Sequence, residues 1–205
     1  MSLLDQFRAP RLRDYWVRWG LHQVHYADRT RKLDLLYRVE NPWRMDSARE
    51  QARFAWTNGV IATHLPRPAT LLEIGCGEGH QSQHLKPICG RLYGIDISSR
   101  AVDRARRRCP EASFAVGDPF TFRFTDTPPV LDLVVACEMI YYVRDIGQLI
   151  ERMSHLGRAC LVTYYHGHAR KLDPHFSALS RCEREGFGFG DARWIAVWWR
   201  NERSR

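Results

Sequence analysis

The stretch Thr70-Leu71-Leu72-Glu73-Ile74-Gly75-Cys76-Gly77-Glu78-Gly79 decides how this chain folds. It starts as a short apolar run typical of a buried strand and ends in three glycines at alternate positions, with a polar segment behind them. Small residues let a ligand approach the backbone, and a helix that follows a strand presents free N–H groups to that ligand. A strand, a glycine turn and a helix in this order predict a nucleotide pocket in an α/β sheet.

Apolar runs alternate with helical patterns along the rest of the chain. Strands are expected at 91–96, 112–118, 131–137, 158–165 and 194–199, with an edge strand around Phe187 and Phe189. Helices are expected at 78–86, after a cap at Ser98 or Ser99, around 146–153 and near 174–185. This alternation predicts a doubly wound, mostly parallel sheet with helices on both faces.

The first 69 residues are too few and too rich in aromatic residues to form a domain of their own. The spacing predicts an amphipathic helix over 11–19, another turn or two around Leu36, and a helix from about 48 to 64. A capping box of Ser47 and Glu50 starts the last of these, and its predicted inner face holds Ala52, Ala55, Trp56 and Val60. We expect one domain over 1–205, with 1–69 as a helical cap over the mouth of the pocket and 70–205 as the α/β core.

Composition limits the protein class. The 205 residues are 44% hydrophobic, which fits a folded protein, and the longest apolar runs stay well below the ~20 residues that span a bilayer. The N-terminus has no long apolar core of a signal peptide, so a cytoplasmic protein without membrane contact is expected. Six cysteines without a C-x-x-C pair argue against a zinc site, and we expect no metal. The net charge of +8 leaves nucleic acid open as a partner, although arginine is scattered along the chain.

Polar residues gather at the carboxyl ends of the predicted strands, where ligands bind in open α/β sheets. This is the main functional signal of the sequence. The residues in question are Glu73, Gly75, Asp96, Asp118, Cys137, Glu138 and Tyr165.

The glycine turn does not match a dinucleotide site. That fingerprint requires a small residue where His80 stands, which argues against a nicotinamide oxidoreductase. The pattern E-x-G-x-G-x-G from Glu73 instead resembles motif I of the class I S-adenosylmethionine-dependent methyltransferases. The resemblance continues through Asp96, Gly117-Asp118 and the strand motif over 131–143. More narrowly, Asn41-Pro42-Trp43 ahead of a helix is similar to the small N-methyltransferases of the nodulation-factor type.

The resemblance implies S-adenosylmethionine as the cofactor. The acid at Asp96 would accept hydrogen bonds from the ribose hydroxyls, Asp118 would face the exocyclic amine of adenine, and Phe120 would contact the ring. Trp43 lies in a loop beside Arg44, and the two could hold an adenosyl or carboxylate group. The cofactor-binding residues predicted are Trp43, Glu73, Gly75, Cys76, Gly77, Gly79, Asp96, Ile97, Asp118, Pro119, Phe120 and Cys137.

Methyl transfer from a sulfonium depends mainly on alignment of the reacting groups, with a base where a proton must leave. Glu138 and His166 are the candidate catalytic residues, since both follow strand ends. An imidazole has a pKa suited to accepting a proton near neutrality. Tyr141, Tyr142 and His168 are further candidates for positioning the acceptor.

The predicted function is methyl transfer to a nitrogen or oxygen of a small molecule. One alternative is a tRNA or rRNA methyltransferase that uses the basic surface. Members of the family that methylate RNA ends carry an acid-and-histidine metal cluster after the fourth strand, and 138–142 contains no histidine. Another alternative is a non-catalytic partner subunit that binds the cofactor. The acceptor and the oligomeric state are left open.

Overall fold

The computed structural model describes residues 29–201, with side chains from residue 33 on. The helix predicted over 11–19 therefore lies outside the described residues. The single domain over 1–205 and the cap over 1–69 stay predictions for the same reason.

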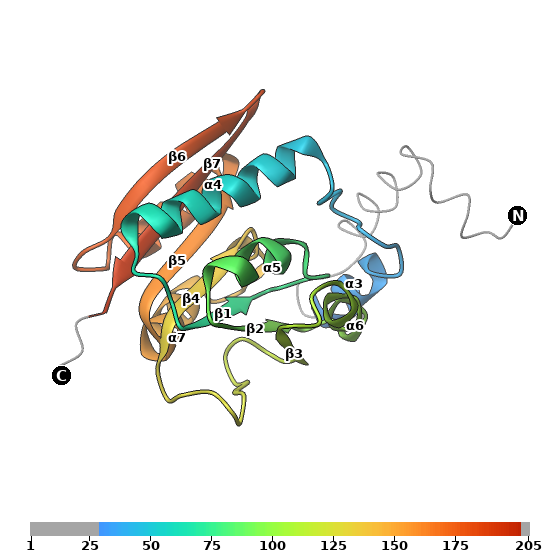
Figure 1. Cartoon of the computed structure of the whole chain (residues 1–205). Coiled ribbons are helices and arrows are strands. Elements are labelled where there is room, and N and C mark those ends of the chain that lie inside the picture. Colours follow the sequence, from blue (N-terminus) through green and yellow to red (C-terminus); the bar gives the residue numbers. More distant parts are fainter. Residues whose placement is uncertain (1–28, 202–205) are drawn as a thin grey trace, which may run out of the picture.

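The described strands form one seven-stranded sheet in the order β3-β2-β1-β4-β5-β7-β6 (Figure 1). Strands β1 to β5 run parallel, and β7 is antiparallel to both of its neighbours, β5 and β6. The strand order reverses between β1 and β4, so a crevice forms at their carboxyl ends. The strands are β1 (Thr70–Ile74), β2 (Arg91–Asp96), β3 (Ser113–Val116), β4 (Leu131–Cys137), β5 (Gly157–Tyr165), β6 (Glu183–Phe189) and β7 (Ala192–Arg200).

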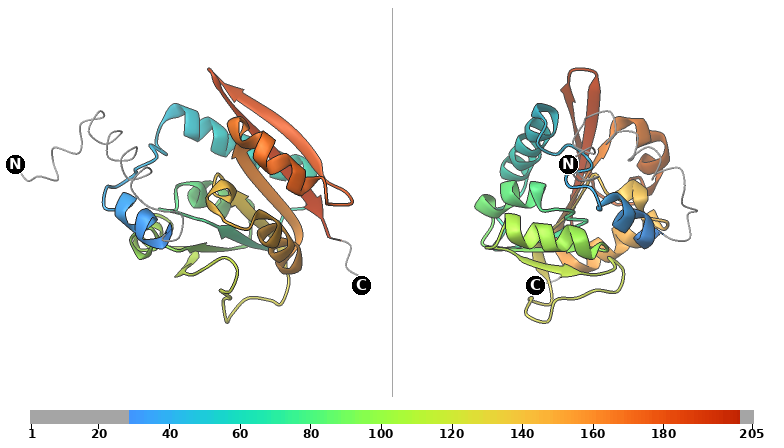
Figure 2. Two further views of the ribbon diagram at one scale, coloured as in Figure 1. Left: turned by 180° about the vertical axis from the view of Figure 1, so that it is seen from behind. Right: turned by 90° about the vertical axis from the view of Figure 1, so that its right-hand side faces the viewer.

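Helices cover both faces of the sheet, which confirms the predicted doubly wound arrangement (Figure 2). On one face Ile61 of α4 packs with Leu71 and Leu133, and on the other Met153 of α7 packs with Leu72. Neighbouring strand residues face opposite sides, so apolar runs such as β4 are buried on both. The helices are α3 (Arg29–Leu36), α4 (Ala48–His64), α5 (His80–Leu85), α6 (Ser99–Arg108), α7 (Ile146–Leu156) and α8 (Ala169–Phe176), with short 3-10 turns η1 (Lys86–Ile88), η2 (Ile140–Tyr142) and η3 (His166–His168).

Helix α4 has the predicted bounds but a different inner face. Ser47 caps it by accepting a hydrogen bond from the Glu50 N–H, whereas the Glu50 carboxylate turns to Arg53 instead of returning to the cap. The buried residues are Glu50, Arg53, Phe54, Thr57, Val60 and Ile61, while Ala55 is exposed. Val60 is buried as predicted, Trp56 packs against the core from a partly buried position and Ala52 is partly buried, so the predicted face was wrong at Ala55 and missed the buried ion pair of Glu50 and Arg53.

The helix predicted near 174–185 was also misplaced. Helix α8 occupies 169–176 with Pro174 inside it, and residues from Glu183 onward belong to β6. Glu183 pairs with Trp198 and Glu185 with Ala196, so the long neighbouring strand β7 draws this segment into the sheet. The predicted edge strand around Phe187 and Phe189 is confirmed.

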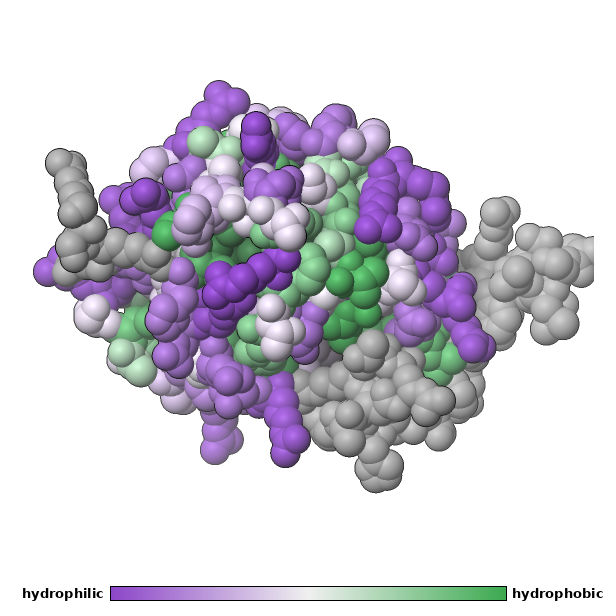
Figure 3. Space-filling view, turned by 90° about the horizontal axis from the view of Figure 1, so that it is seen from below, coloured by the Kyte–Doolittle hydropathy of each residue, from purple (hydrophilic) through white to green (hydrophobic). Residues whose placement is uncertain are grey.

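The basic face of α6 is largely engaged in internal contacts. Arg106 donates to the Phe114 carbonyl, Arg108 to the Glu78 carbonyl, and Arg104 forms an ion pair with the Glu78 carboxylate. These three arginines therefore hold α6 against the glycine turn and β3. Seen from below, hydrophilic residues border smaller apolar areas of the surface (Figure 3). Among the described helices, none has the length and apolarity required to cross a membrane.

Candidate active site

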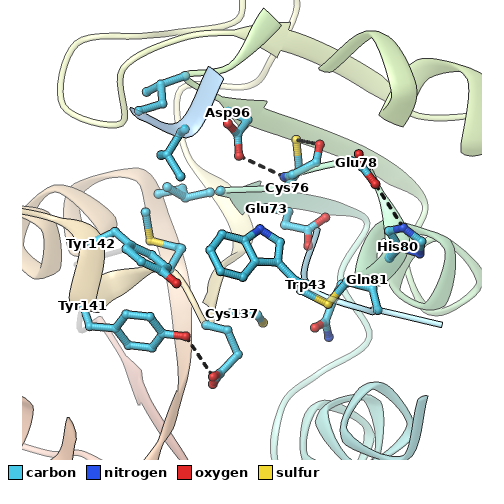
Figure 4. A pocket seen from close by; sticks show the side chains of 18 of the residues that line it. Trp43, Glu73, Cys76, Glu78, His80, Gln81, Asp96, Cys137, Tyr141 and Tyr142 are labelled. Atoms are coloured by element: carbon cyan, nitrogen blue, oxygen red, sulfur yellow. Dashed lines mark hydrogen bonds and ion pairs between the residues drawn. The ribbon is translucent and has the colours of Figure 1, made fainter. Parts of the chain in front are cut away.

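A cavity of about 590 Å³ opens at the carboxyl ends of β1, β2 and β4, where the strand order reverses. Figure 4 shows Asp96 at one end of it, Tyr141 and Tyr142 along one side, and Gln81 and His80 on the opposite side. Most of the predicted site residues line this cavity. They are Trp43, Glu73, Gly75, Cys76, Gly77, Asp96, Ile97, Asp118, Pro119, Phe120, Cys137 and Glu138.

The glycine turn presents bare backbone to the cavity. Gly75 and Gly77 have backbone φ values of +75° and +53°, which residues other than glycine seldom adopt. A Cβ at Gly75 would lie 2.7 Å from Met139, and a Cβ at Gly77 would lie 2.9 Å from the Tyr37 hydroxyl oxygen. Both glycines are thus required by conformation and by space, and they leave room for a ligand that approaches the chain closely.

Gly79 has a different role from the one predicted. It does not line the cavity, and a Cβ on it would lie 2.9 Å from the Ala105 Cα. Its φ of +79° and this close contact allow the turn to pack against α6. The absence of a side chain at Gly79 therefore serves helix packing.

Asp96 ends β2 with its carboxylate at the glycine turn. One oxygen accepts a hydrogen bond of 3.0 Å from the Gly77 N–H, and the other accepts one of 2.9 Å from the Ser98 N–H. Burial raises the pKa of Asp96 to about 6, against the effect of these backbone donors. Each oxygen keeps a further lone pair, so the carboxylate can still accept hydrogen bonds from a hydroxyl-bearing ligand.

Glu73 lies buried beneath the turn, where its carboxylate accepts a hydrogen bond from the Ser82 hydroxyl of α5. Burial raises the pKa of Glu73 to about 8, and the Ser82 hydrogen bond and the charge of Arg53 offset only part of this. In the unliganded protein Glu73 is therefore mostly uncharged near neutrality.

The loop after β3 supplies the wall beyond Asp96. Asp118 is exposed and its carboxylate accepts a hydrogen bond of 2.8 Å from the Phe120 N–H, which closes the turn. Ile97, Pro119 and Phe120 line the cavity beside it. This arrangement combines an exposed acceptor with apolar surface, as a purine ring requires.

The loop that carries Trp43 is fastened to the glycine turn through Glu78. The Asn41 N–H donates to the Glu78 carboxylate at 2.9 Å, and Arg104 donates to the Val39 carbonyl while it pairs with the same carboxylate. These contacts place the Trp43 indole over the cavity, with its ring centroid 6.0 Å from that of Tyr142.

Glu138 follows β4 with a φ of +56°, an uncommon conformation for a residue with a side chain. Its Oε2 accepts a hydrogen bond of 3.1 Å from the Tyr141 hydroxyl. Its Oε1 is buried and accepts no hydrogen bond within the described part of the chain, although the Trp194 indole lies near. Burial raises the pKa of Glu138 to about 7, although Arg53 and Tyr141 favour the ionised form.

Aromatic rings surround Glu138. Tyr141 packs on Tyr142 and stacks on His168, with centroid distances of 4.7 and 4.4 Å. Tyr165 and Trp194 line the cavity from β5 and β7, with centroids 6.3 Å apart. This half of the cavity combines aromatic surface with a carboxylate oxygen that has no hydrogen-bond partner among the described residues, which suits an amine or a cation.

The prediction for His166 is not supported by its position. His166 is exposed in η3 and does not line the cavity, whereas His168, two residues later, does. Successive side chains of a 3-10 turn point about 120° apart, so these two histidines face different directions. The sequence could not select between them.

Among the described residues, Arg53 and Gln81 are buried polar residues of the cavity wall that were not predicted as site residues, as are Glu50 and Glu78. Arg53 of α4 is 1% exposed, and its Nε donates to Glu50 at 2.8 Å. Its Nη1 donates to the Gln81 side-chain oxygen at 2.9 Å. Arg53 and Gln81 lie on helices with polar sequences, and such sequences usually indicate a face exposed to solvent. The only sequence feature that could have identified them as site residues is that Arg53 is close to the capping box and Gln81 is close to the glycine turn.

Comparisons with known proteins agree with this geometry. The methyltransferase domain family matches residues 72–159. Nodulation protein S of Sinorhizobium fredii is 33% identical over 136 residues, which are 63% of this chain and 62% of that protein. A dTDP-3-amino-3,6-dideoxy-alpha-D-glucopyranose N,N-dimethyltransferase of Streptomyces fradiae is 36% identical over 73 residues, 36% of this chain and 28% of that protein. The matched regions thus span less than two thirds of these curated relatives.

The fold has a close counterpart among solved structures. N-methyltransferase NodS from Bradyrhizobium japonicum WM9, in complex with S-adenosyl-l-homocysteine, superimposes with a TM-score of 0.73. The two chains are 23% identical, and the match covers 86% of this chain and all of the other. The sheet order and this superposition show that the chain has the fold of the class I S-adenosylmethionine-dependent methyltransferases, and residues 72–159 match their methyltransferase domain.

Proposed function

We propose that this chain transfers the methyl group of S-adenosylmethionine to the nitrogen of a small-molecule amine. The observation that carries the proposal is Glu138, a half-buried residue after the end of β4, whose Oε1 is buried and accepts no hydrogen bond within residues 29–201. It lies in the aromatic half of the same cavity that holds the glycine turn and Asp96. The cofactor supplies an electrophilic methyl group, and the protein supplies alignment and a proton acceptor.

The residues present fit the cofactor. Gly75 and Gly77 keep the cavity wall free of side chains, and Asp96 offers lone pairs where a ribose would lie. Ile97, Pro119 and Phe120 provide apolar surface next to Asp118 for a purine. We therefore assign the cofactor to the half of the cavity between the glycine turn and the loop after β3.

We favour nitrogen over oxygen as the methyl acceptor because of Glu138, whose carboxyl group faces the half of the cavity proposed for the acceptor. A free amine is protonated near neutrality and must lose a proton before its lone pair can attack. Burial raises the pKa of Glu138 to about 7, which suits a group that accepts a proton near that pH. Two of the similar proteins carry N-methylation in their names, the Streptomyces N,N-dimethyltransferase and NodS.

Replacing Asp96 with alanine should weaken binding of S-adenosylhomocysteine by about 1.5–3 kcal/mol, because charge-assisted hydrogen bonds to the ribose are lost. Isothermal titration calorimetry measures this directly. Asp103→Ala on the exposed face of α6 is the matched control and should leave the affinity unchanged. An unchanged affinity in Asp96→Ala would remove Asp96 from the cofactor site.

The proposed activity can be tested with labelled S-adenosylmethionine. The protein is incubated with pairs of small acceptors that differ only in carrying an amine or a hydroxyl, and with an extract separated into RNA, protein and small molecules. Label on nitrogen in the small-molecule fraction supports the proposal. Label confined to RNA, or transfer to hydroxyls alone, would contradict it.

A further inference from the structure

The side of the cavity opposite Tyr141 and Tyr142 holds a polar corner with unused hydrogen-bond donors (Figure 4). Gln81 is only 6% exposed, and its side-chain nitrogen, Nε2, has no hydrogen-bond partner among the described residues. Burying an amide N–H without an acceptor is unfavourable, so such a group calls for an explanation. Arg53 lies next to it and also lines the cavity.

The orientation of the Gln81 amide follows from its neighbour. A guanidinium has only donors, so the oxygen of the amide must face Arg53, as the 2.9 Å contact shows. The NH2 group is then turned away from Arg53. Arg53 is held in turn by Glu50 through its Nε, and among the described residues the hydrogen-bond partner of its Nη2 is the sulfur of Met45, at 4.0 Å. Within residues 29–201, Gln81 Nε2 and Arg53 Nη2 thus have no oxygen acceptor.

A carboxylate is the group that would satisfy this corner, because it accepts from an amide N–H and a guanidinium at once. The amino-acid part of S-adenosylmethionine ends in the one carboxylate of that cofactor. Asp96 marks the ribose end, and Glu73 lies between Asp96 and Gln81 in Figure 4. We propose that Gln81, with Arg53 behind it, binds the carboxylate of the cofactor, an inference that rests on the proposed function.

The acids around this corner do not oppose an anion there. Glu50 pairs with two arginines, Arg53 and Arg49, so these three residues together carry a net positive charge. Burial raises the pKa of Glu73 to about 8 and that of Glu138 to about 7, so Glu73 is mostly uncharged near neutrality and Glu138 is only partly ionised. The net charge of this corner is therefore positive near neutrality, which favours an anionic ligand.

The test compares two ligands in the intact protein without an acceptor. One is S-adenosylhomocysteine, and the other is its decarboxylated form, which keeps the amine and lacks only the carboxylate. Gln81→Glu retains an oxygen for Arg53 but places an anion where the amide NH2 was. This substitution should weaken the affinity for S-adenosylhomocysteine by roughly 10- to 100-fold, as expected for loss of a hydrogen bond to a charged group. The affinity for the decarboxylated ligand should change by less than about threefold.

The readout is the affinity for S-adenosylhomocysteine divided by the affinity for the decarboxylated ligand. A variant that is only less stable would weaken both affinities and would not change this ratio. Gln83→Glu on the same helix, at an exposed position, should leave the ratio as in the wild type. Gln81→Met, which carries no charge, should lower the ratio to a smaller extent. Equal weakening of both ligands, or no change in either, would overturn the carboxylate site. Failure of the wild type to bind either ligand would instead overturn the proposed function.

Discussion

Replacing Glu138 with glutamine is expected to slow methyl transfer by about 10²- to 10⁴-fold, the usual contribution of a positioned general base. Glutamine has nearly the same shape and can still accept from the Tyr141 hydroxyl, but it cannot take a proton from the acceptor amine. Binding of S-adenosylhomocysteine should stay within about threefold of the wild type, because Glu138 faces the other half of the cavity. Initial rates with a saturating amine and calorimetric titration measure the two quantities.

The pH dependence provides a second readout for the same residue. Burial raises the pKa of Glu138 to about 7, so below this pH the carboxyl is protonated and cannot accept another proton. The wild-type rate should therefore rise as the pH increases through about 7, and the residual rate of Glu138→Gln should lack this rise. Arg53 and Glu50 of α4, Tyr141 and Tyr142 of η2, and Trp194 of β7 also influence this titration.

A matched control is Glu151→Gln on the exposed side of α7, which should keep the full rate and the wild-type pH profile. An unimpaired Glu138→Gln enzyme would show that the amine loses its proton without this carboxylate. A rate reduced equally at every pH would assign Glu138 to positioning of the acceptor instead of proton transfer.

Replacing Arg53 with leucine should lower the free energy of unfolding by about 3–5 kcal/mol, the range for breaking a buried ion pair from one side. Arg53 is 1% exposed, and its removal leaves the buried Glu50 carboxylate with only the exposed Arg49 as a counter-ion among the described residues and takes away the donor of the Gln81 oxygen. Leucine keeps part of the contact with Phe54 but supplies no hydrogen bond. Urea denaturation of the unliganded protein gives the free energy of unfolding.

Arg49 is the natural control for this experiment. It contacts the same Glu50 at 3.2 Å, yet its side chain is 51% exposed, so Arg49→Leu should cost less than about 1 kcal/mol. Similar losses in the two variants would mean that burial contributes nothing to the effect of Arg53, and the ion pair would then be no more important than one on the surface.

Much of the sheet could be predicted from local sequence. Strands β1, β2 and β4 stand at the predicted residues because an uninterrupted apolar run suits a position buried on both faces. The cap at Ser47 and the positive φ values at the glycine turn are also local properties of single residues. The resemblance carried by Glu73 and the alternating glycines then sufficed to predict the methyltransferase fold and its cofactor.

The tertiary structure decided the roles of polar residues whose surroundings come from distant parts of the chain. Arg53 and Gln81 stand 28 residues apart on separate helices, and each becomes a wall residue only because the two helices pack together. Glu185 lies in a strand instead of a helix because it pairs with β7. His168 lines the cavity and His166 does not, because the 3-10 turn directs their side chains differently. Local patterns determine which segments form strands and turns, since those depend on neighbours in sequence. Burial, charge pairing and the direction of a side chain depend on neighbours in space, and these only the fold supplies.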